Sequence, residues 1–496
     1  DTGGWHRCVC VSAVVSLNCP GSGVMGGLLW LGLIIAALAV SAGVYLAVMD
    51  ARNCPQSPRL IRRRRHTVST QVRAHCGTWP CKLGNARRSG ATDCIAPTDL
   101  SLPRWSYFTP SVVYNAPLID EHSNVYVIAT SGEVFALDPN GEVRWLYKTR
   151  LPDPANPAMQ DDTLFTLDTG GFGYALSTQT GQERWVRKVA DRAGGGNDAV
   201  AVGEGLVIFH QHIGAAGWTD EAEFIACEVD TGREVWRSRV DSNYFNVMPA
   251  FAENGSAIVF TDQNGGTFKL ESRTGRVLWA QPGFPFPLTP EEHWYGAVGE
   301  APRSHSALAL VGDGVIYTAG NPTRSRGRVR ALSLASGEEL WSRKFELMMG
   351  NGGALADIDG VPTLVFGVGI PALHPIPEAN PPYHGKVYAL DASTGATLWS
   401  FRAAPLADWK AAGSVMYSRC FQMNMPDAFS APTIDGNGTV YIGWQSGIVY
   451  AINGRNGKLV SFYETNEGIQ AAPSIGPRGE LIVAGGRHTH SFWPEQ

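Results

Sequence analysis

The sequence contains few of the motifs that identify a catalytic site. No Gly-rich phosphate loop, no ordered set of Ser, His and Asp and no paired-carboxylate motif is recognisable in its 496 residues. Cysteine is scarce: there are nine, no two of them adjacent, and beyond residue 97 only Cys227 and Cys420 occur. The sequence therefore names no reaction, and its information lies in a repeated pattern.

Charge is missing from two stretches near the start of the chain. Residues 25–49 contain no charged side chain, and residues 51–92 contain ten Lys and Arg but no Asp or Glu. Residues 93–496 contain 29 basic and 43 acidic residues, a formal charge of 29 − 43 = −14. A field of this sign makes nucleic acid an unsuitable partner for that region. The basic stretch includes Arg62 to Arg65 and could contact anionic lipid or act as a sorting signal.

The uncharged stretch 25–49 is long enough to span a bilayer as one hydrophobic helix. We expect a single-pass transmembrane anchor, and the alternative is a cleaved signal peptide with an acceptable cleavage context at Val40-Ser41-Ala42. Residues 1–24 form an extension to which we assign no function. The side of the membrane stays open, because three signals disagree.

The arginine-rich flank places the rest of the chain in the cytoplasm by the positive-inside rule. An apolar segment followed by an acid-free Arg/Ser-rich stretch also resembles the two-part leader of proteins routed to complex plastids. Two glycosylation sequons, at Asn254 and Asn437, point to the secretory pathway instead. Residues 50–97 are interpreted as a basic linker. Its four cysteines could form two disulfides, bind zinc or have no role: Cys54, Cys76, Cys81 and Cys94.

A glycine turn followed by an outer-strand anchor recurs seven times, with a period of 40 to about 60 residues. The copies are 136–145, 175–185, 227–236, 269–279, 331–341, 389–399 and 451–462. Six of them end in tryptophan, at Trp145, Trp185, Trp236, Trp279, Trp341 and Trp399, and the seventh has Ser461 with Phe462 beside it. This period is the length of one four-stranded propeller blade.

Residues 112–148 show the expected blade, with four short apolar or alternating runs separated by polar and glycine turns. We expect the glycine to supply a positive φ and the tryptophan to pack into the neighbouring blade. A β-sandwich with a repeated turn is the alternative. Trp105 lies 40 residues before Trp145, whereas residues 471–493 supply strands without a final outer one. The Trp105 strand should therefore complete the last blade and close an eight-bladed all-β propeller over residues 98–493.

The pattern A-x-D-x-x-T-G-x-x-x-W, clearest at Ala389–Trp399, resembles the quinoprotein or PQQ-like repeat. This repeat is found in eight-bladed quinoprotein alcohol dehydrogenases and in non-catalytic relatives such as the bacterial outer-membrane assembly lipoprotein. The resemblance covers residues 98–493. The repeat is specific for the propeller fold but is weak evidence for any activity. The dehydrogenases stack their quinone on two adjacent cysteines, which this chain lacks, and their calcium ligands have no matching motif here.

Strand parity predicts where a binding site lies. Connections between the first and second strands of a blade, and between the third and fourth, are uniformly short. The other connections, which share the opposite face, carry the long insertions near 210–223, 280–304, 320–327, 369–385 and 402–428. Long loops on a rigid scaffold are where binding usually occurs. The candidate binding residues on this face are His210, His212, Trp218, His293, Trp294, Tyr295, His374, Tyr383, His384 and Trp444.

Several of these residues have a structural alternative. His210-x-His212 could offer two imidazoles to a metal or be an ordinary strand end, and His488-x-His490 has the same ordinary interpretation. Trp444 could stack on a ligand or fill the central channel. Asp168 and Asp262 could form an acidic rim or cap their hairpins.

Two functions follow as hypotheses. The favoured one is a non-catalytic scaffold, membrane-tethered or organelle-directed, that binds a protein or polymer through its loop-rich face and needs no cofactor. The other is a quinoprotein-like oxidoreductase, dependent on PQQ and calcium, with a degenerate site.

Overall fold

The chain divides into two units, residues 1–54 and 55–496. The computed structural model describes residues 60–62, 77–193, 198–212, 222–240, 247–262, 266–281, 309–323, 326–369, 382–407 and 428–495. The extension 1–24 and the hydrophobic stretch 25–49 lie outside these ranges. Within the described residues, no helix is long and apolar enough to cross a membrane.

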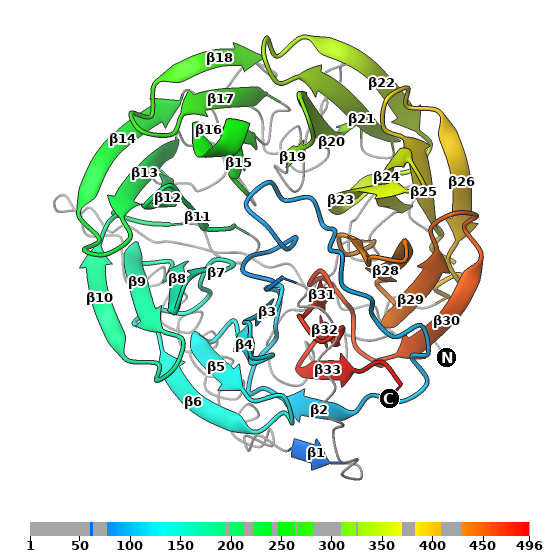
Figure 1. The fold of residues 1–496 in the computed structure, drawn as a ribbon, viewed down its shortest axis with the longest axis horizontal. Coiled ribbons are helices and arrows are strands. Elements are labelled where there is room, and N and C mark those ends of the chain that lie inside the picture. The colour runs from blue at the N-terminus through cyan, green and yellow to red at the C-terminus, as the bar shows by residue number, and fades with distance from the viewer. Residues whose placement is uncertain are drawn as a thin grey trace, which may run out of the picture. The chain divides into compact units, whose positions relative to one another are not determined.

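The described part of the second unit is an all-β propeller with eight blades, as the sequence predicted (Figure 1). Each blade is an antiparallel sheet of four strands, and the strands follow one another from the centre of the ring to its rim. Blade 1 contains β3 (Leu118–Ile119), β4 (Val125–Ile128), β5 (Glu133–Leu137) and β6 (Val143–Lys148), and blade 2 contains β7 (Ala158–Gln160), β8 (Thr163–Leu167), β9 (Phe172–Ser177) and β10 (Glu183–Lys188). Blade 3 contains β11 (Ala201–Gly203), β12 (Leu206–His212), β13 (Ala222–Glu228) and β14 (Glu234–Val240). Blade 4 contains β15 (Ala250–Ala252), the 3-10 turn η1 (Glu253–Gly255), β16 (Ala257–Thr261), β17 (Thr267–Glu271) and β18 (Val277–Gln281).

Blades 5 to 8 repeat the arrangement. Blade 5 contains β19 (Ala309–Val311), β20 (Val315–Thr323), β21 (Arg326–Ser333) and β22 (Glu339–Phe345), and blade 6 contains β23 (Met349–Ile358), β24 (Val361–Gly369), β25 (Gly385–Asp391) and β26 (Thr397–Arg402). Blade 7 contains β27 (Thr433–Ile434), β28 (Thr439–Gly443), β29 (Ile448–Asn453) and β30 (Leu459–Glu464). Blade 8 contains β31 (Ser474–Ile475), β32 (Leu481–Gly485), β33 (His488–Phe492) and, from the start of the chain, β2 (Trp105–Phe108). A fifth strand, β1 (Leu60–Arg62), pairs with the outer edge of β2.

The two ends of the propeller segment meet in blade 8. Strand β2 pairs with β33 in the register Trp105↔Ser491 to Phe108↔His488, although these strands lie almost 400 residues apart in sequence. In Figure 1 the cyan β2 lies beside the red β33. The predicted closure by the Trp105 strand is confirmed. It leaves no open gap in the ring, because the last blade receives its outer strand from the start of the chain.

Each repeat tryptophan joins its own blade to the next one. Its indole packs on the turn glycine of the following blade, and its Nε1 donates a hydrogen bond to a carbonyl oxygen there. The acceptors lie 2.5 to 3.1 Å away: Pro139 for Trp105, Thr178 for Trp145, Val229 for Trp185, Ser272 for Trp236, Leu334 for Trp279, Ala392 for Trp341 and Gly454 for Trp399. Five of the seven side chains are buried and two, Trp279 and Trp341, are half-buried. These contacts support the predicted structural role of the tryptophans, which substitution tests directly.

The seam between blades 7 and 8 lacks this tryptophan. Ser461 takes its place and donates from its hydroxyl to the carbonyl of Thr98, which precedes the first strand of the propeller. Tyr463, two residues further along β30, packs its ring on His490 and Phe492 of blade 8, with centroids 5.2 and 5.1 Å away. The substituted repeat thus coincides with the junction where the chain closes on itself.

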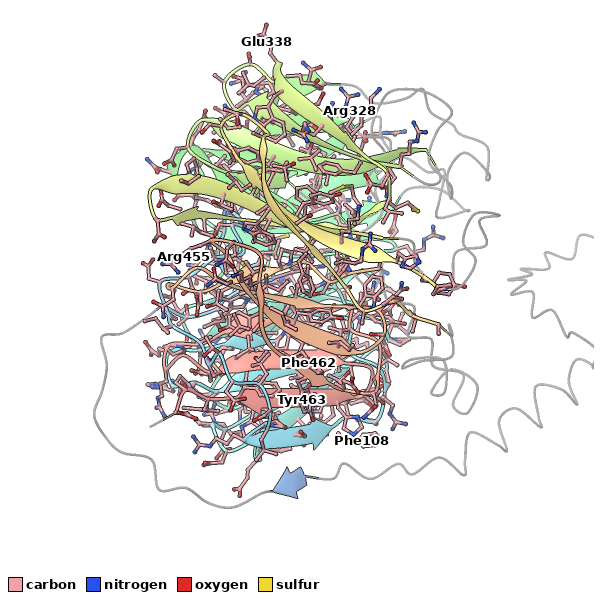
Figure 2. All side chains as sticks on the ribbon, turned by 90° about the vertical axis from the view of Figure 1, so that its right-hand side faces the viewer. Phe108, Arg328, Glu338, Arg455, Phe462 and Tyr463 are labelled. Carbon is pink, nitrogen blue, oxygen red and sulfur yellow. The ribbon has the colours of Figure 1, made fainter. Side chains whose placement is uncertain are left out.

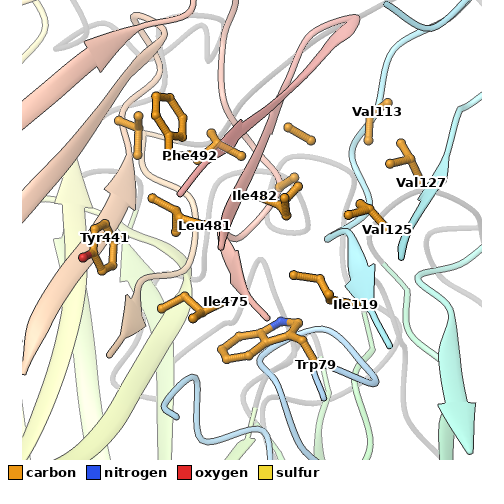
Figure 3. Packing of buried hydrophobic residues seen from close by; sticks show 14 of the residues in the cluster. Trp79, Val113, Ile119, Val125, Val127, Tyr441, Ile475, Leu481, Ile482 and Phe492 are labelled. Carbon is orange, nitrogen blue, oxygen red and sulfur yellow. The ribbon is translucent and has the colours of Figure 1, made fainter. Parts of the chain in front are cut away.

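Residues 77–97, which we call the N-terminal plug, cross the centre of the ring (Figure 1). Backbone amides of the innermost strands donate to plug carbonyls at 2.6 to 3.1 Å: Met159 to Pro80, Phe251 to Ala86, Val311 to Arg87, Leu355 to Ser89 and Ile434 to Gly90. Trp79 pairs with Ile119 of blade 1 and is buried in one hydrophobic cluster with Ile475 of blade 8 (Figure 3). The sequence interpretation placed these residues in a linker, whereas the structure packs them against the inner strands.

Candidate functional site

The propeller has two unlike faces. The connections between first and second strands and between third and fourth strands form the short-turn face, and the plug lies on it, since Gly436 in one of these turns donates to the plug carbonyl of Cys94. The remaining connections form the loop-rich face. In Figure 2, Glu338 and Arg455 mark the short-turn edge, while Arg328 and Phe108 lie toward the opposite edge. The plug therefore lies at the short-turn face, and the strand ends from which the long connections leave lie at the opposite face.

Many of the predicted binding residues lie outside the described residues. These are Trp218, His293, Trp294, Tyr295 and His374. His212 ends β12, and only its backbone is described. The described members are His210, Tyr383, His384 and Trp444. Of these four, only His384 is exposed.

His210 lies inside strand β12 rather than in a loop, and its side chain is fully buried. Its Nε2 lies 2.9 Å from Oδ2 of Asp198, and Oδ1 of Asp198 accepts a hydrogen bond from the amide of Val247 at 2.7 Å. The pair therefore connects blade 3 to the start of blade 4. No group of three or more His, Cys, Asp and Glu among the described residues is arranged to hold a metal ion.

Trp444 is also buried, in the seam between blades 6 and 7. Its ring lies 4.5 Å from that of Phe429, and it packs so closely on Gly385 that a Cβ there would approach the indole to 2.4 Å. Glycine is required at 385 by this contact. Tyr383 is fixed by two backbone hydrogen bonds with Leu406, at 2.8 and 3.0 Å. These two aromatic residues anchor the bases of loops.

The acidic candidates cap hairpins. Oδ1 of Asp168 accepts from the amides of Gly170 and Phe172 at 3.0 and 3.1 Å, and its Oδ2 accepts from Tyr174 Oη at 2.6 Å. Asp262 accepts from the amide of Gly266 at 2.6 Å. Both carboxylates are buried and do not form a rim. The sequence alone had left both arrangements open, an acidic rim and hairpin caps.

The described cysteines are buried free thiols, at Cys81, Cys94 and Cys227. Cys81 and Cys94 belong to the plug, so the disulfides considered for them are not formed. Burial raises the pKa of the Cys227 thiol to about 12. Cys54, Cys76 and Cys420 lie outside the described residues. The residues present do not fit a stacked quinone, because no two cysteines are adjacent and Cys227 lies in the seam between blades 2 and 3.

Arg88 fastens the plug to the propeller, and sequence reasoning missed it. It is buried, and its guanidinium donates to three carbonyl oxygens: Pro249 at 3.2 Å, Val200 at 2.9 Å and Lys82 at 2.9 Å. The neighbouring Arg87 points outward instead and pairs with the exposed Asp313 at 2.5 Å. The signal in the sequence was the mixture of large apolar residues, Trp79 and Leu83, with basic ones, which a solvated linker does not need.

A profile of the family described as outer membrane protein assembly factor BamB matches residues 102–209 and 196–369, which together cover more than half of the chain. The chain belongs to this family of PQQ-like propellers. BamB from Escherichia coli K12 is 24% identical over 356 residues, 66% of this chain and 81% of that protein. Tetrathionate hydrolase from Acidithiobacillus ferrooxidans is 22% identical over 223 residues, 42% of this chain and 40% of the enzyme.

Solved structures agree on the fold of this BamB-type propeller. Quinohemoprotein alcohol dehydrogenase from Comamonas testosteroni superimposes with a TM-score of 0.59 at 14% identity, covering 84% of this chain and 82% of that one. BamB from Moraxella catarrhalis gives a TM-score of 0.53 at 16% identity, covering 78% and 98%. Likeness at this level of identity shows the fold alone, so the function must be argued from the faces of this chain.

Proposed function

We propose that this protein is a non-catalytic scaffold that engages a protein partner through its loop-rich face. The observation that carries the proposal is the asymmetry of the ring. The chain's own plug occupies the centre of the short-turn face through hydrogen bonds to six of the eight innermost strands, whereas the long connections all leave from the other face.

The family supports a binding role, because the relatives in it carry the name assembly factor. The rigid blades would hold the loops, and aromatic side chains in those loops would provide contact area at low entropic cost. Trp218, Trp294 and Tyr295 are the anchors we propose, together with the exposed His384.

A membrane tether through residues 25–49 is part of the proposal. The support is the absence of charge over that stretch and the basic segment that follows it. Retention of this stretch as an anchor or its removal as a signal peptide decides the compartment in which the propeller lies.

The second candidate is a quinoprotein-like oxidoreductase with a degenerate site. Its support is the fold shared with quinohemoprotein alcohol dehydrogenase. Adding PQQ and calcium to the purified chain separates the two candidates: an oxidoreductase would melt at a higher temperature with its ligands, and the scaffold would not respond.

The test of the scaffold is a set of charge substitutions. Trp218→Asp and Trp294→Asp should abolish capture of the partner without changing the melting temperature. Glu338→Lys, in an exposed short turn, is the control and should have little effect. Asp435, although it also lies in a short turn, is unsuitable as a control, because it is buried and accepts hydrogen bonds from Thr439 and from Ala96 of the plug. Loss of capture in the Glu338 variant alone would contradict the proposal.

A further inference from the structure

Two glycosylation sequons occur in the sequence, and the structure places both on the short-turn face. Asn254, with Ser256 two positions later, lies in the connection between β15 and β16 of blade 4. Asn437, with Thr439 two positions later, lies in the matching connection of blade 7. Both asparagines are exposed. Arg455, which Figure 2 shows at the short-turn edge, donates to the carbonyl of Asn437 at 2.9 Å. Both sequons thus lie at the end of the ring opposite to the long connections.

The sequon of blade 4 has both of its defining residues at the surface. Asn254 has a φ of +55° and a ψ of +37°, a left-handed conformation that asparagine adopts more readily than most residues. Ser256 is exposed, and its hydroxyl donates to the carbonyl of Glu253 at 2.9 Å. In blade 7, by contrast, the hydroxyl-bearing Thr439 is buried. The blade 4 turn is therefore the sequon that remains fully accessible after the propeller has folded.

A hollow of about 580 Å³ adjoins this turn, and Asn254 is part of its lining. The hollow is bounded by the first turns of blades 3, 4 and 5 and by the plug, and it contains the carboxylates of Glu204 and Asp313 and the guanidinium of Arg87. Its volume is in the range of small-molecule binding pockets. Charged groups of both signs can exchange hydrogen bonds with the hydroxyl groups of a sugar. Sugars attached to Asn254 would therefore find space beside the turn.

We propose that Asn254 carries an N-linked oligosaccharide. The proposal goes beyond the scaffold function, because it assigns a modification to the face that the partner does not use. A glycan is bulky and hydrophilic, so it is tolerated only at the surface, where Asn254 and Ser256 both lie. Attached at this turn, it would cover part of the plug-bearing face and leave the loop-rich face open to a protein partner.

The modification requires that the propeller follow residues 25–49 into the lumen of the secretory pathway. A cleaved signal peptide meets this requirement, and so does an anchor whose C-terminal side is lumenal. An anchor that keeps the basic segment in the cytoplasm, as the positive-inside rule predicts, excludes it. The described thiols suit an oxidising lumen, since Cys81, Cys94 and Cys227 are buried and so shielded from oxidation.

The transfer step balances with a donor of one chemical class, an oligosaccharide joined to a lipid through a diphosphate. Nδ2 of Asn254 forms a bond to C1 of the first sugar while the bond from C1 to the phosphate oxygen breaks. The lipid diphosphate leaves with the bonding electron pair, and one amide proton passes to a base of the transferase. Nothing is oxidised or reduced, so no further reactant is needed.

The experiment is glycopeptide mass spectrometry on the full chain, purified from the membrane and secreted fractions of the cells that produce it. The peptide that contains Asn254 should carry hexose and N-acetylhexosamine, and peptide N-glycosidase should release them. The modification should be lost in Asn254→Asp, which keeps a residue that tolerates the left-handed turn. It should also be lost in Ser256→Ala and kept in Ser256→Thr, since threonine retains the hydroxyl that the sequon requires.

The matched control is Asn140→Asp, in an exposed short turn of blade 1 where glycine also follows the asparagine but residue 142 is Glu. It should leave the glycan on Asn254 unchanged. An unmodified Asn254 peptide, a glycan that persists in Ser256→Ala, or a chain confined to the cytosol would each overturn the proposal. If the glycan is absent while partner capture still depends on Trp218 and Trp294, the scaffold function stands and only this site falls.

Discussion

The indole of Trp145 in blade 1 packs on Gly181 in blade 2. A Cβ on Gly181 would lie 2.7 Å from the indole, and the residue has a φ of +71°. The same contact recurs between successive blades, with a register shift in each hairpin that precedes the tryptophan. One glycine thus satisfies two requirements at once, a left-handed turn and close approach of the ring.

The first prediction separates these two requirements. Gly181→Ala should lower the free energy of unfolding by about 2–4 kcal/mol, because strain from positive φ is added to a clash in a packed seam. Gly205→Ala is the control, since its φ is +73° and a Cβ there would meet nothing within 4 Å. Urea denaturation measures both. Equal losses in the two variants would show that the indole contact contributes nothing.

The second prediction concerns the tryptophan itself. Trp236→Ala should cost about 3–5 kcal/mol, as expected for truncation of a large core side chain. The indole is buried, and its hydrogen bond to Ser272 at 2.8 Å is lost as well. The denaturation midpoint measures the effect. A change below about 1 kcal/mol, the scale of ordinary surface substitutions, would mean that this junction is not structural.

The third prediction tests the plug with two adjacent residues. Arg88→Ala should destabilise the chain by about 3 kcal/mol or more, because three buried carbonyls lose a charged donor. Arg87→Ala removes an exposed ion pair with Asp313 and a part-buried hydrogen bond from Nε to the Val311 carbonyl at 3.2 Å, and should cost only about 1 kcal/mol. Amide hydrogen exchange on the innermost strands should increase in the Arg88 variant only. Similar exchange in both would place the plug outside the stabilised core.

The fourth prediction concerns pH. Burial, with a smaller contribution from the charge of His488, lowers the pKa of His490 from 6.5 to about 3. The unfolded chain therefore binds a proton at a pH where the folded chain does not, and stability falls as the pH drops from about 6.5 toward 3. His490→Phe places a non-titrating aromatic ring where blade 1 has Phe135. The loss of stability with falling pH should therefore be smaller in this variant.

Urea midpoints at pH 7 and pH 5 measure the slope, and the exposed His122→Phe provides the control. An unchanged slope in the His490 variant, or an equal change in the His122 variant, would assign the acid sensitivity to other groups.

The fifth prediction follows from the closure of the ring. Deleting residues 98–110 removes β2 and exposes the edge of β33, so the protein should aggregate. Light scattering after size exclusion measures this. Deleting residues 1–57 should leave a monomeric propeller, and a monomeric product from the first deletion would contradict the closure argument.

The sequence was sufficient to predict the blades, but it did not predict how the side chains near the central axis pack. Trp145 and its counterparts could be predicted because a local spacing repeats, and each repeat carries its own turn and anchor. The plug could not, since Trp79 and Arg88 are held by strands far away in sequence and have no period of their own. His210 and Trp444 were assigned to a binding face from their positions beside loops, yet alternation along a strand decides which face a side chain occupies.

The most direct test of the central claim is site-specific photocrosslinking in cells that contain the native partner. A photoreactive residue would replace His384 on the loop-rich face or Trp294 in the long connection that follows β18, and Glu338 or Asn140 on the short-turn face. The scaffold account predicts adducts of one defined protein from the loop-rich positions and none from the short turns. Adducts from the short-turn positions alone would show that the partner binds the opposite end of the propeller.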